Sequence, residues 1–176
     1  MKFEMFHLMP YRELPEDFNE KYRSVWVDIP SHLFNAERAH SMYNDTLDEL
    51  EYGAAMGFDG VCVNEHHSTS YGLMPSPIVM ASILSQLTKR VRIAVLGSAI
   101  PLRDHPLTLA EEHAMIDVLS GGRLISGFVR GIGSEYHAFG VNPTFSHERF
   151  HEAHDLITAA WRDPGPFPFY GKHYRF

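Results

Sequence analysis

The sequence predicts an α/β protein in which parallel strands alternate with helices. Short runs of β-forming residues lie at Lys2–Met9, Gly60–Asn64, Val91–Ser98 and Leu124–Phe128, and helical patterns lie between them. The last three runs begin at residues 60, 91 and 124, so the repeat is 31 and then 33 residues long. The first interval has the same length if the Pro- and charge-rich segment Tyr11–Asn35 is an insertion. Equal β-α units form either a doubly wound sheet or a (β/α)8 barrel.

Four helices are expected, one after each strand. The first carries apolar residues at helical spacing and ends near Gly57, and the second opens at Ser76–Pro77, a cap residue followed by proline at the first helical position. The third opens at Thr108, which forms a capping-box pattern with Glu111. Ser146 caps the fourth. The apolar face of the third helix is expected to consist of Leu107, Ala110, Ala114 and Val118.

Four β-α units are half of a barrel, which needs about 250 residues. The last stretch, "PGPFPFYGKHYRF", contains three prolines and two glycines and no fifth strand pattern. We therefore expect residues 1–176 to be the N-terminal half of a larger barrel, with an inserted loop at residues 11–35. A complete open sheet of four units is the alternative.

Composition excludes several classes of protein. The chain has 44% hydrophobic and 21% charged residues and a net charge of −7, which are values of a globular domain. Its basic residues do not cluster, so neither nucleic acid nor a membrane surface is an expected partner. Cys62 is the single cysteine, which excludes an internal disulfide framework. No apolar run reaches the roughly 18 residues of a membrane span, and we expect a cytoplasmic protein.

Polar clusters follow the predicted strands, where α/β proteins place their chemistry. Glu65-His66-His67 comes after the second strand, and it could be a metal site, a catalytic base or a polar strand end. Adjacent residues at a strand end point to opposite sides, and zinc would need further ligands. Arg130 follows the fourth strand and suits either an anion such as phosphate or solvent. The pair Gly131-x-Gly133 is only part of a dinucleotide-binding pattern.

Three stretches together resemble the bacterial luciferase-like flavin monooxygenases. They read "NEHHSTSYGLMPSP", "VRIAVLGSAIPLRDHPLTLAEEHAMIDVLSGGRLISGFVRG" and "PFPFYGKHYRF", and the similarity spans the chain apart from the insertion. The resemblance implies a (β/α)8 TIM barrel, of which this chain supplies the first four units. It also implies reduced FMN at the C-terminal mouth, where O2 gives a peroxyflavin that oxidises a small organic substrate.

The same resemblance assigns roles to particular residues. His66 matches the active-site histidine, an expected base, and Arg130 matches an arginine that contacts the flavin phosphate. Glu111 matches an acid near the isoalloxazine. The Gly97–Ser98 bond matches the place of an unusual cis peptide packed against the flavin. Val129 stands where luciferase has a reactive cysteine, so no thiol chemistry is expected, and no metal site is implied.

The resemblance also implies partners and leaves alternatives open. A separate flavin reductase would supply reduced FMN, because no segment resembles a nicotinamide-binding domain, and the full-length protein would be a homo-oligomer. Water must be kept from the reacting flavin, and the expected apolar cover consists of Trp26, Phe34, Tyr71, Leu73 and Met74, unless these residues only pack. The alternatives are a deazaflavin-dependent oxidoreductase, a flavin-binding protein without turnover and a metal-dependent hydrolase.

Overall fold

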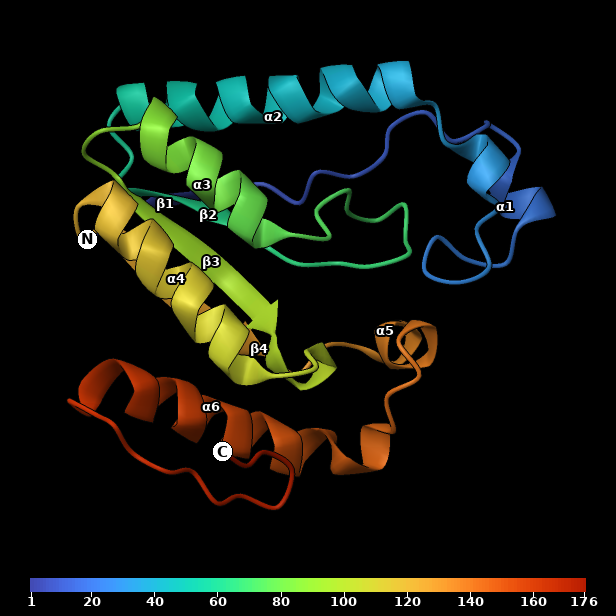
Figure 1. The fold of residues 1–176 in the computed structure, drawn as a ribbon. Helices are drawn as coiled ribbons and strands as arrows, with labels where there is room; N and C mark the ends of the chain where they lie inside the picture. Colours follow the sequence, from blue (N-terminus) through green and yellow to red (C-terminus); the bar gives the residue numbers. More distant parts are fainter.

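A computed structural model describes residues 1–176 and shows one parallel sheet lined by helices (Figure 1). Strands β1 (Glu4–Phe6), β2 (Gly60–Val63), β3 (Arg92–Ala99) and β4 (Leu124–Val129) pair in chain order, and every pair is parallel. A doubly wound sheet reverses its strand order at a switch point, whereas a barrel keeps chain order. The topology therefore corresponds to four consecutive units of a (β/α)8 barrel.

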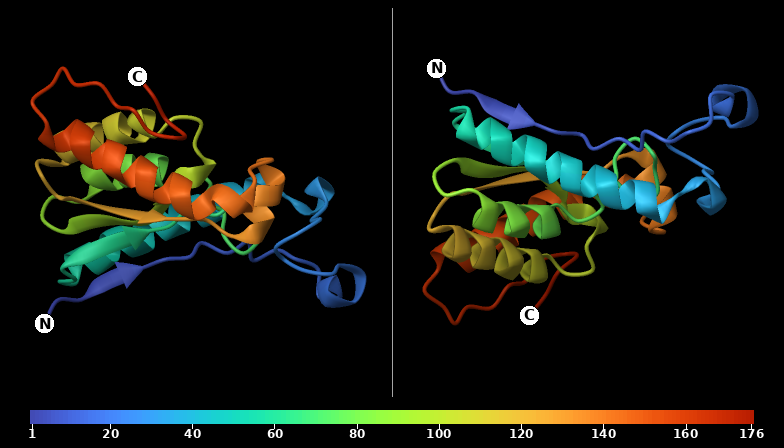
Figure 2. Two further views of the ribbon diagram at one scale, coloured as in Figure 1. Left: turned by 90° about the horizontal axis from the view of Figure 1, so that it is seen from below. Right: turned by 90° about the horizontal axis from the view of Figure 1, so that it is seen from above.

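The helices follow the strands as the sequence predicts, with short additions. The long helices are α2 (Ala36–Ala55), α3 (Pro77–Leu87), α4 (Pro106–Ser120) and α6 (Ser146–Arg162). Two short helices, α1 (Phe18–Lys21) and α5 (Gly133–Ala138), lie in the loops after β1 and β4, and 3₁₀ turns occupy Ser31–Leu33, Ile100–Leu102 and Pro143–Phe145. The insertion carries α1, which projects away from the sheet (Figure 2).

Two elements, β1 and α4, differ clearly from their expected bounds. β1 is only three residues long, because the chain then turns away from β2 and Met9 has a positive φ of 53°. α4 begins at Pro106 instead of Thr108, since the His105 side chain accepts a hydrogen bond from the Leu107 N–H at 3.2 Å and caps the helix. Proline suits this first helical position, where its missing N–H costs nothing.

The earlier start is accompanied by a different buried face of α4. The buried positions include Leu109, Ala110, His113 and Ile116, whereas Val118 is 81% exposed. The expected face through Ala114 and Val118 is therefore wrong. The observed positions follow spacings of three and four residues, as one face of a helix requires.

The core lies between the sheet and the helices. Val61 and Val63 of β2 and Ile93 and Val95 of β3 are fully buried and belong to a cluster of 12 buried residues that also contains Leu84 of α3. A second cluster of 7 buried residues joins α4 to α6. These strand residues are two apart, so they share the face of the sheet that packs against the helices.

The other face of the sheet carries apolar side chains that remain partly exposed. Because successive strand residues point to opposite faces, each of these side chains follows a residue that packs toward the helices. Their exposed fractions are 45% for Phe6, 48% for Leu96, 37% for Ile125 and 38% for Val129. This face corresponds to the side that lines the interior of a barrel.

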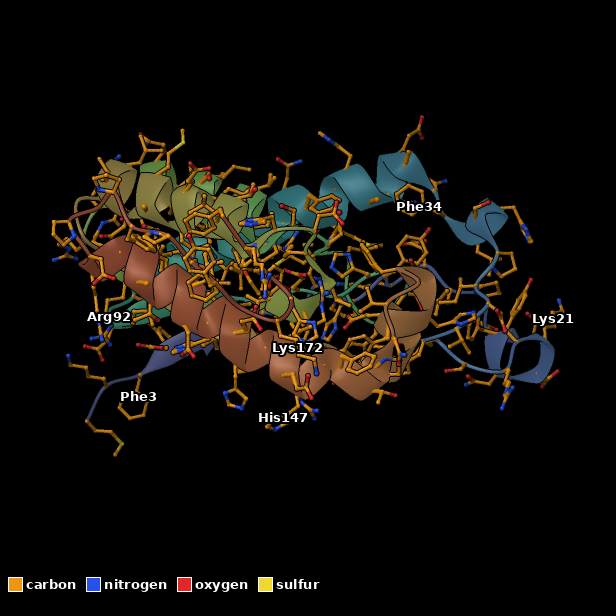
Figure 3. The ribbon with its side chains drawn as sticks, turned by 60° about the horizontal axis from the view of Figure 1, so that its bottom comes forward. Phe3, Lys21, Phe34, Arg92, His147 and Lys172 are labelled. Atoms are coloured by element: carbon orange, nitrogen blue, oxygen red, sulfur yellow. The ribbon has the colours of Figure 1, made fainter.

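The last segment returns along α6 and forms no fifth strand. The Glu152 carboxylate accepts hydrogen bonds from the backbone N–H groups of Lys172, His173 and Tyr174 at 3.0, 2.8 and 2.7 Å. Lys172 also contacts Glu148 at 2.6 Å and lies beside the helix in Figure 3. The prediction that this stretch adds no strand is confirmed.

None of the helices combines the length and the apolar content needed to cross a lipid bilayer.

Candidate functional site

Residues from the ends of all four strands line one cavity of about 340 Å³. His66 enters it from the loop after β2, Gly97 from β3 and Arg130 from the residue after β4. In parallel sheets these C-terminal ends meet at a single edge, the usual position of ligand sites. The structure therefore brings together three of the five site residues that the sequence predicts.

His66 is held by a buried carboxylate. Its Nδ1 lies 3.2 Å from Oε1 of Glu135 in α5, and the same oxygen accepts the backbone N–H of His67 at 3.3 Å. The other oxygen accepts the N–H of Ile132 at 2.9 Å. Burial opposes ionisation of Glu135, but these hydrogen bonds outweigh it and hold its pKa below the ordinary value. An ionised Glu135 can only accept a hydrogen bond, so Nδ1 of His66 carries the proton. The lone pair of the ring is then on Nε2.

Two aromatic rings enclose the other side of His66. Trp26, which lies in the insertion, stacks on Tyr71 with ring centroids 4.2 Å apart. The His66 ring stands edge-on to both, at 5.3 Å from Trp26 and 5.4 Å from Tyr71. The insertion therefore supplies a wall beside the histidine.

The remaining residues of the expected apolar cover lie elsewhere. Phe34 and Leu73 line a different cavity, which the insertion forms with the loop after β2. Met74 is 1% exposed and packs in the main core. Of the five, Trp26 and Tyr71 pack their rings against the His66 ring. Met74 contacts His66 through the backbone, because its carbonyl accepts the His66 N–H at 3.1 Å.

The neighbouring His67 belongs to a separate buried cluster. Its Nε2 lies 2.8 Å from Oε1 of Glu65, and Arg103 donates to Oε2 of the same carboxylate at 2.6 Å. The Glu65 side chain has no exposed surface. A buried carboxylate needs such partners, so the cluster ties the loop after β2 to the loop after β3. The two adjacent imidazole rings therefore engage different carboxylates.

The cis peptide lies one residue earlier than expected, at Leu96–Gly97 instead of Gly97–Ser98. It falls within the register shift that separates Val95 from Ser98 in the pairing of β3 with β4. A Cβ on Gly97 would come within 2.6 Å of the Gly127 carbonyl, so the two backbones approach too closely for any side chain. Gly97 therefore lies at a close approach of the two strands, which no local sequence pattern reveals.

Ser98 faces away from the cavity. It has no exposed surface, and its Oγ lies 3.3 Å from Nε2 of His113 in α4. Nδ1 of that histidine lies 2.8 Å from Oγ of Ser126, so His113 joins β3 to β4 beside the register shift. Burial, with a smaller contribution from the charge of Arg103, lowers the pKa of His113 to about 4. Ser98 thus contacts His113 on the helix-covered face of the sheet.

Glu111 is not at the site, in contrast to the expectation. It is exposed on α4, and it does not line the cavity. The reason is helical geometry. Leu109, Ala110 and His113 are buried, so Glu111 lies on the opposite, exposed side of the helix. The carboxylate that contacts the His66 ring in the cavity is instead Glu135.

Arg130 lies at the rim of the cavity and is exposed. It forms no salt bridge with any carboxylate, and its backbone carbonyl accepts the Tyr136 hydroxyl. The next residue, Gly131, has a φ of 86°, and a Cβ there would lie 3.1 Å from a Glu135 oxygen. Glycine is therefore required where the chain turns from β4 toward α5.

Three polar residues of this region were not predicted. Glu135 follows the recognised Arg130-Gly pattern by only a few residues, but its contact with His66 joins positions 69 residues apart. His113 sits at helical spacing from Leu109 and Ala110, which could have marked it as buried. Asn64 lines the cavity, is 4% exposed and has no hydrogen-bond partner for either amide atom.

Comparison with known proteins defines the class. The sequence model of the luciferase-like monooxygenase family matches residues 26–176, so the chain belongs to this family. It is 30% identical over 131 residues to the alkanal monooxygenase beta chain of Vibrio harveyi, covering 73% of this chain and 40% of that one. It is 28% identical over 138 residues to the oxygenase component of the flavin-dependent trigonelline monooxygenase of Acinetobacter baylyi, covering 77% and 38%.

Solved structures agree with the fold. Monooxygenase RslO1 from Streptomyces bottropensis superposes with a TM-score of 0.79 at 28% identity, over 100% of this chain and 47% of that one. The FMN complex of the 3,6-diketocamphane monooxygenase of Pseudomonas putida gives 0.77 at 17% identity, over 100% and 44%. An F420-dependent secondary alcohol dehydrogenase gives 0.70 at 18%, over 99% and 47%. The predicted barrel units are confirmed, and the chain spans less than half the length of these relatives.

Proposed function

We propose that this chain provides the flavin-binding half of a monooxygenase that uses reduced FMN and O2 to oxidise a small organic substrate. The observation that carries the proposal is the arrangement of His66, buttressed by Glu135, in a cavity with Arg130 at its rim. When bound, reduced FMN would activate O2 for transfer of one oxygen atom to the substrate. The names of relatives support a flavin as cofactor.

The side chains of the cavity are suited to such a cofactor. Arg130 offers an unpaired guanidinium, which binds phosphate well. Leu96 and Val129 line the same cavity and are 48% and 38% exposed, so they offer apolar surface for a flat ring system. Nothing in this donor set resembles a nicotinamide site, and a separate flavin reductase is the proposed source of reduced FMN.

His66 would handle the proton of the reaction. Glu135 fixes the ring through Nδ1, and no other side chain engages Nε2. Imidazole is the side chain most often used as a general acid or base. Trp26 and Tyr71 cover the ring with aromatic surface, which limits access of water to the reacting groups.

We also propose that the protein works as a homo-oligomer. Helices α3 and α4 contact each other and carry exposed apolar side chains. These are Val79, Ile83 and Leu87 of α3, and Met115, Val118 and Leu119 of α4. Apolar surface concentrated in this way is typical of protein interfaces, and sedimentation velocity would measure the oligomeric state.

A cofactor titration tests the proposed function. The purified protein should bind reduced FMN under anaerobic conditions, and admission of O2 with a suitable organic substrate should consume one O2 per product. Deazaflavin F420 is the matched comparison, because related barrels use it. Binding of F420 without binding of FMN would replace the monooxygenase by a deazaflavin-dependent oxidoreductase. Binding of FMN without oxygen consumption would indicate a flavin-binding protein without turnover.

Arg130 should govern cofactor affinity through the phosphate. Arg130→Ala removes a charge-assisted contact worth about 1.5–3 kcal/mol, so FMN should bind roughly tenfold to hundredfold more weakly. Riboflavin lacks the phosphate and should bind the variant about as well as it binds the original protein. Fluorescence titration with both flavins measures the difference. Equal weakening for the two flavins would contradict the assignment of Arg130 to the phosphate.

A further inference from the structure

Asn64 is a buried polar side chain of the cavity that forms no hydrogen bond. It directly follows β2, is 4% exposed and lines the same cavity as His66 and Arg130. Neither Nδ2 nor Oδ1 has a hydrogen-bond partner. Buried side-chain amides nearly always form hydrogen bonds. An amide that has none and lines a ligand cavity is therefore expected to form its hydrogen bonds with the ligand.

The neighbouring carboxylates and His66 are engaged elsewhere, and Arg130 is exposed at the rim of the cavity and offers donors only. Glu65 bonds to His67 and Arg103, and His66 bonds to Glu135. The side chains that share the cavity with Asn64 are otherwise largely apolar, among them Phe6, Leu8 and Leu96.

The chemistry of a carboxamide defines what it can recognise. It presents an N–H donor and a C=O acceptor side by side, so its complement is a ligand edge with an acceptor next to a donor. The pyrimidine-dione ring of a flavin has such an edge, an imide N–H between two carbonyls. A hydrocarbon substrate has none, and a phosphate offers acceptors only.

We propose that Asn64 recognises the imide edge of the bound flavin ring. This role is separate from that of Arg130, and it rests on the proposed binding of flavin in this cavity. The amide is shielded from solvent, so a neighbouring side chain must move before a ligand reaches it. Phe6 and Leu96 line the cavity and are 45% and 48% exposed, which leaves them room to turn aside.

The decisive experiment combines one substitution with one altered ligand. Asn64→Leu keeps the volume of the side chain and removes its hydrogen bonds. In the purified protein it should weaken binding of FMN and of riboflavin alike, by roughly tenfold for two neutral hydrogen bonds. Flavin methylated at the imide nitrogen should bind the original protein more weakly, and Asn64→Leu should not weaken it much further. Arg130→Ala is the matched control, because its effect should depend on the phosphate and not on the imide.

The outcomes separate this proposal from the proposed function. If the original protein binds no flavin, the proposed function fails. If it binds flavin and Asn64→Leu binds FMN equally well, the role of Asn64 is overturned while the function stands. If Asn64→Leu lowers the melting temperature without ligand and leaves flavin affinity unchanged, Asn64 has only a structural role. Unequal weakening of FMN and riboflavin would also overturn the proposal.

Discussion

Replacing His66 by alanine should lower turnover by about 10²–10⁴-fold, the usual contribution of a positioned acid–base group. The fold and most of the flavin affinity should remain, because the ring is held at the cavity by a single carboxylate and is not part of the main core. Rates of substrate oxidation with excess reduced FMN, together with a flavin titration, measure the two effects separately. Imidazole added to the variant should restore part of the rate, since it can enter the space of the missing ring.

His67→Ala is the matched control. It removes the same kind of side chain one position away, but from the buried cluster with Glu65 and Arg103. Its expected effect is a loss of about 1–3 kcal/mol of unfolding free energy, with turnover per folded molecule nearly unchanged. Full activity in His66→Ala would refute the assignment of the base. So would an activity that a chelator abolishes and zinc restores, because that result would make the histidines metal ligands.

Local patterns were enough to predict the α/β class and the repeating unit. Short segments rich in β-forming residues predicted strands at Gly60–Asn64 and Leu124–Phe128. The structure places β2 and β4 within one residue of these limits. The opening of α3 at Pro77 follows from proline at the first helical position. Such signals lie in residues that are neighbours in the sequence, so they can be recognised without knowledge of the tertiary structure.

The candidate site was predictable only in part. His66, Gly97 and Arg130 follow strands, and the fold alone brings them to one edge. Glu135 was not predicted, because its contact with His66 depends on how α5 folds back over the loop after β2. Similarly, the close approach of Gly97 to Gly127 is a contact between two strands. Contacts between distant segments decide these features, and a single sequence does not display them.

Two expectations for α4 were wrong, its first residue and its buried face. The capping-box pattern at Thr108 and Glu111 competes with a cap from His105, which precedes Pro106. The cap at His105 begins the helix earlier, at Pro106. Independently, the buried face includes His113 and not Ala114. A polar residue then occupies a core position and Glu111 faces solvent. A pattern that admits only apolar residues to the buried face misses His113, although its spacing from Leu109 and Ala110 is helical.

The buried His113 should make the stability of the protein fall in mildly acidic solution. Its pKa is lowered from 6.5 to about 4, chiefly by burial. Between these two pH values the unfolded chain binds a proton that the folded chain does not, so acid favours unfolding. The stability that the neutral His113 contributes is fully present above pH 6.5, decreases as the pH falls and is lost below pH 4. A shift of this size corresponds to about 3 kcal/mol.

Urea unfolding of the original protein and of His113→Gln, at several pH values from 7 to 4, isolates this effect. Glutamine can still donate to one serine and accept from the other, as His113 does between Ser98 and Ser126, but it does not titrate. The other acid-sensitive groups, including Glu135 with its lowered pKa, are common to both proteins and cancel in the difference. The unfolding free energy of the original protein should therefore fall relative to that of the variant by about 3 kcal/mol over this range. A difference between the two proteins that stays constant with pH would show that His113 does not remain neutral in the folded state.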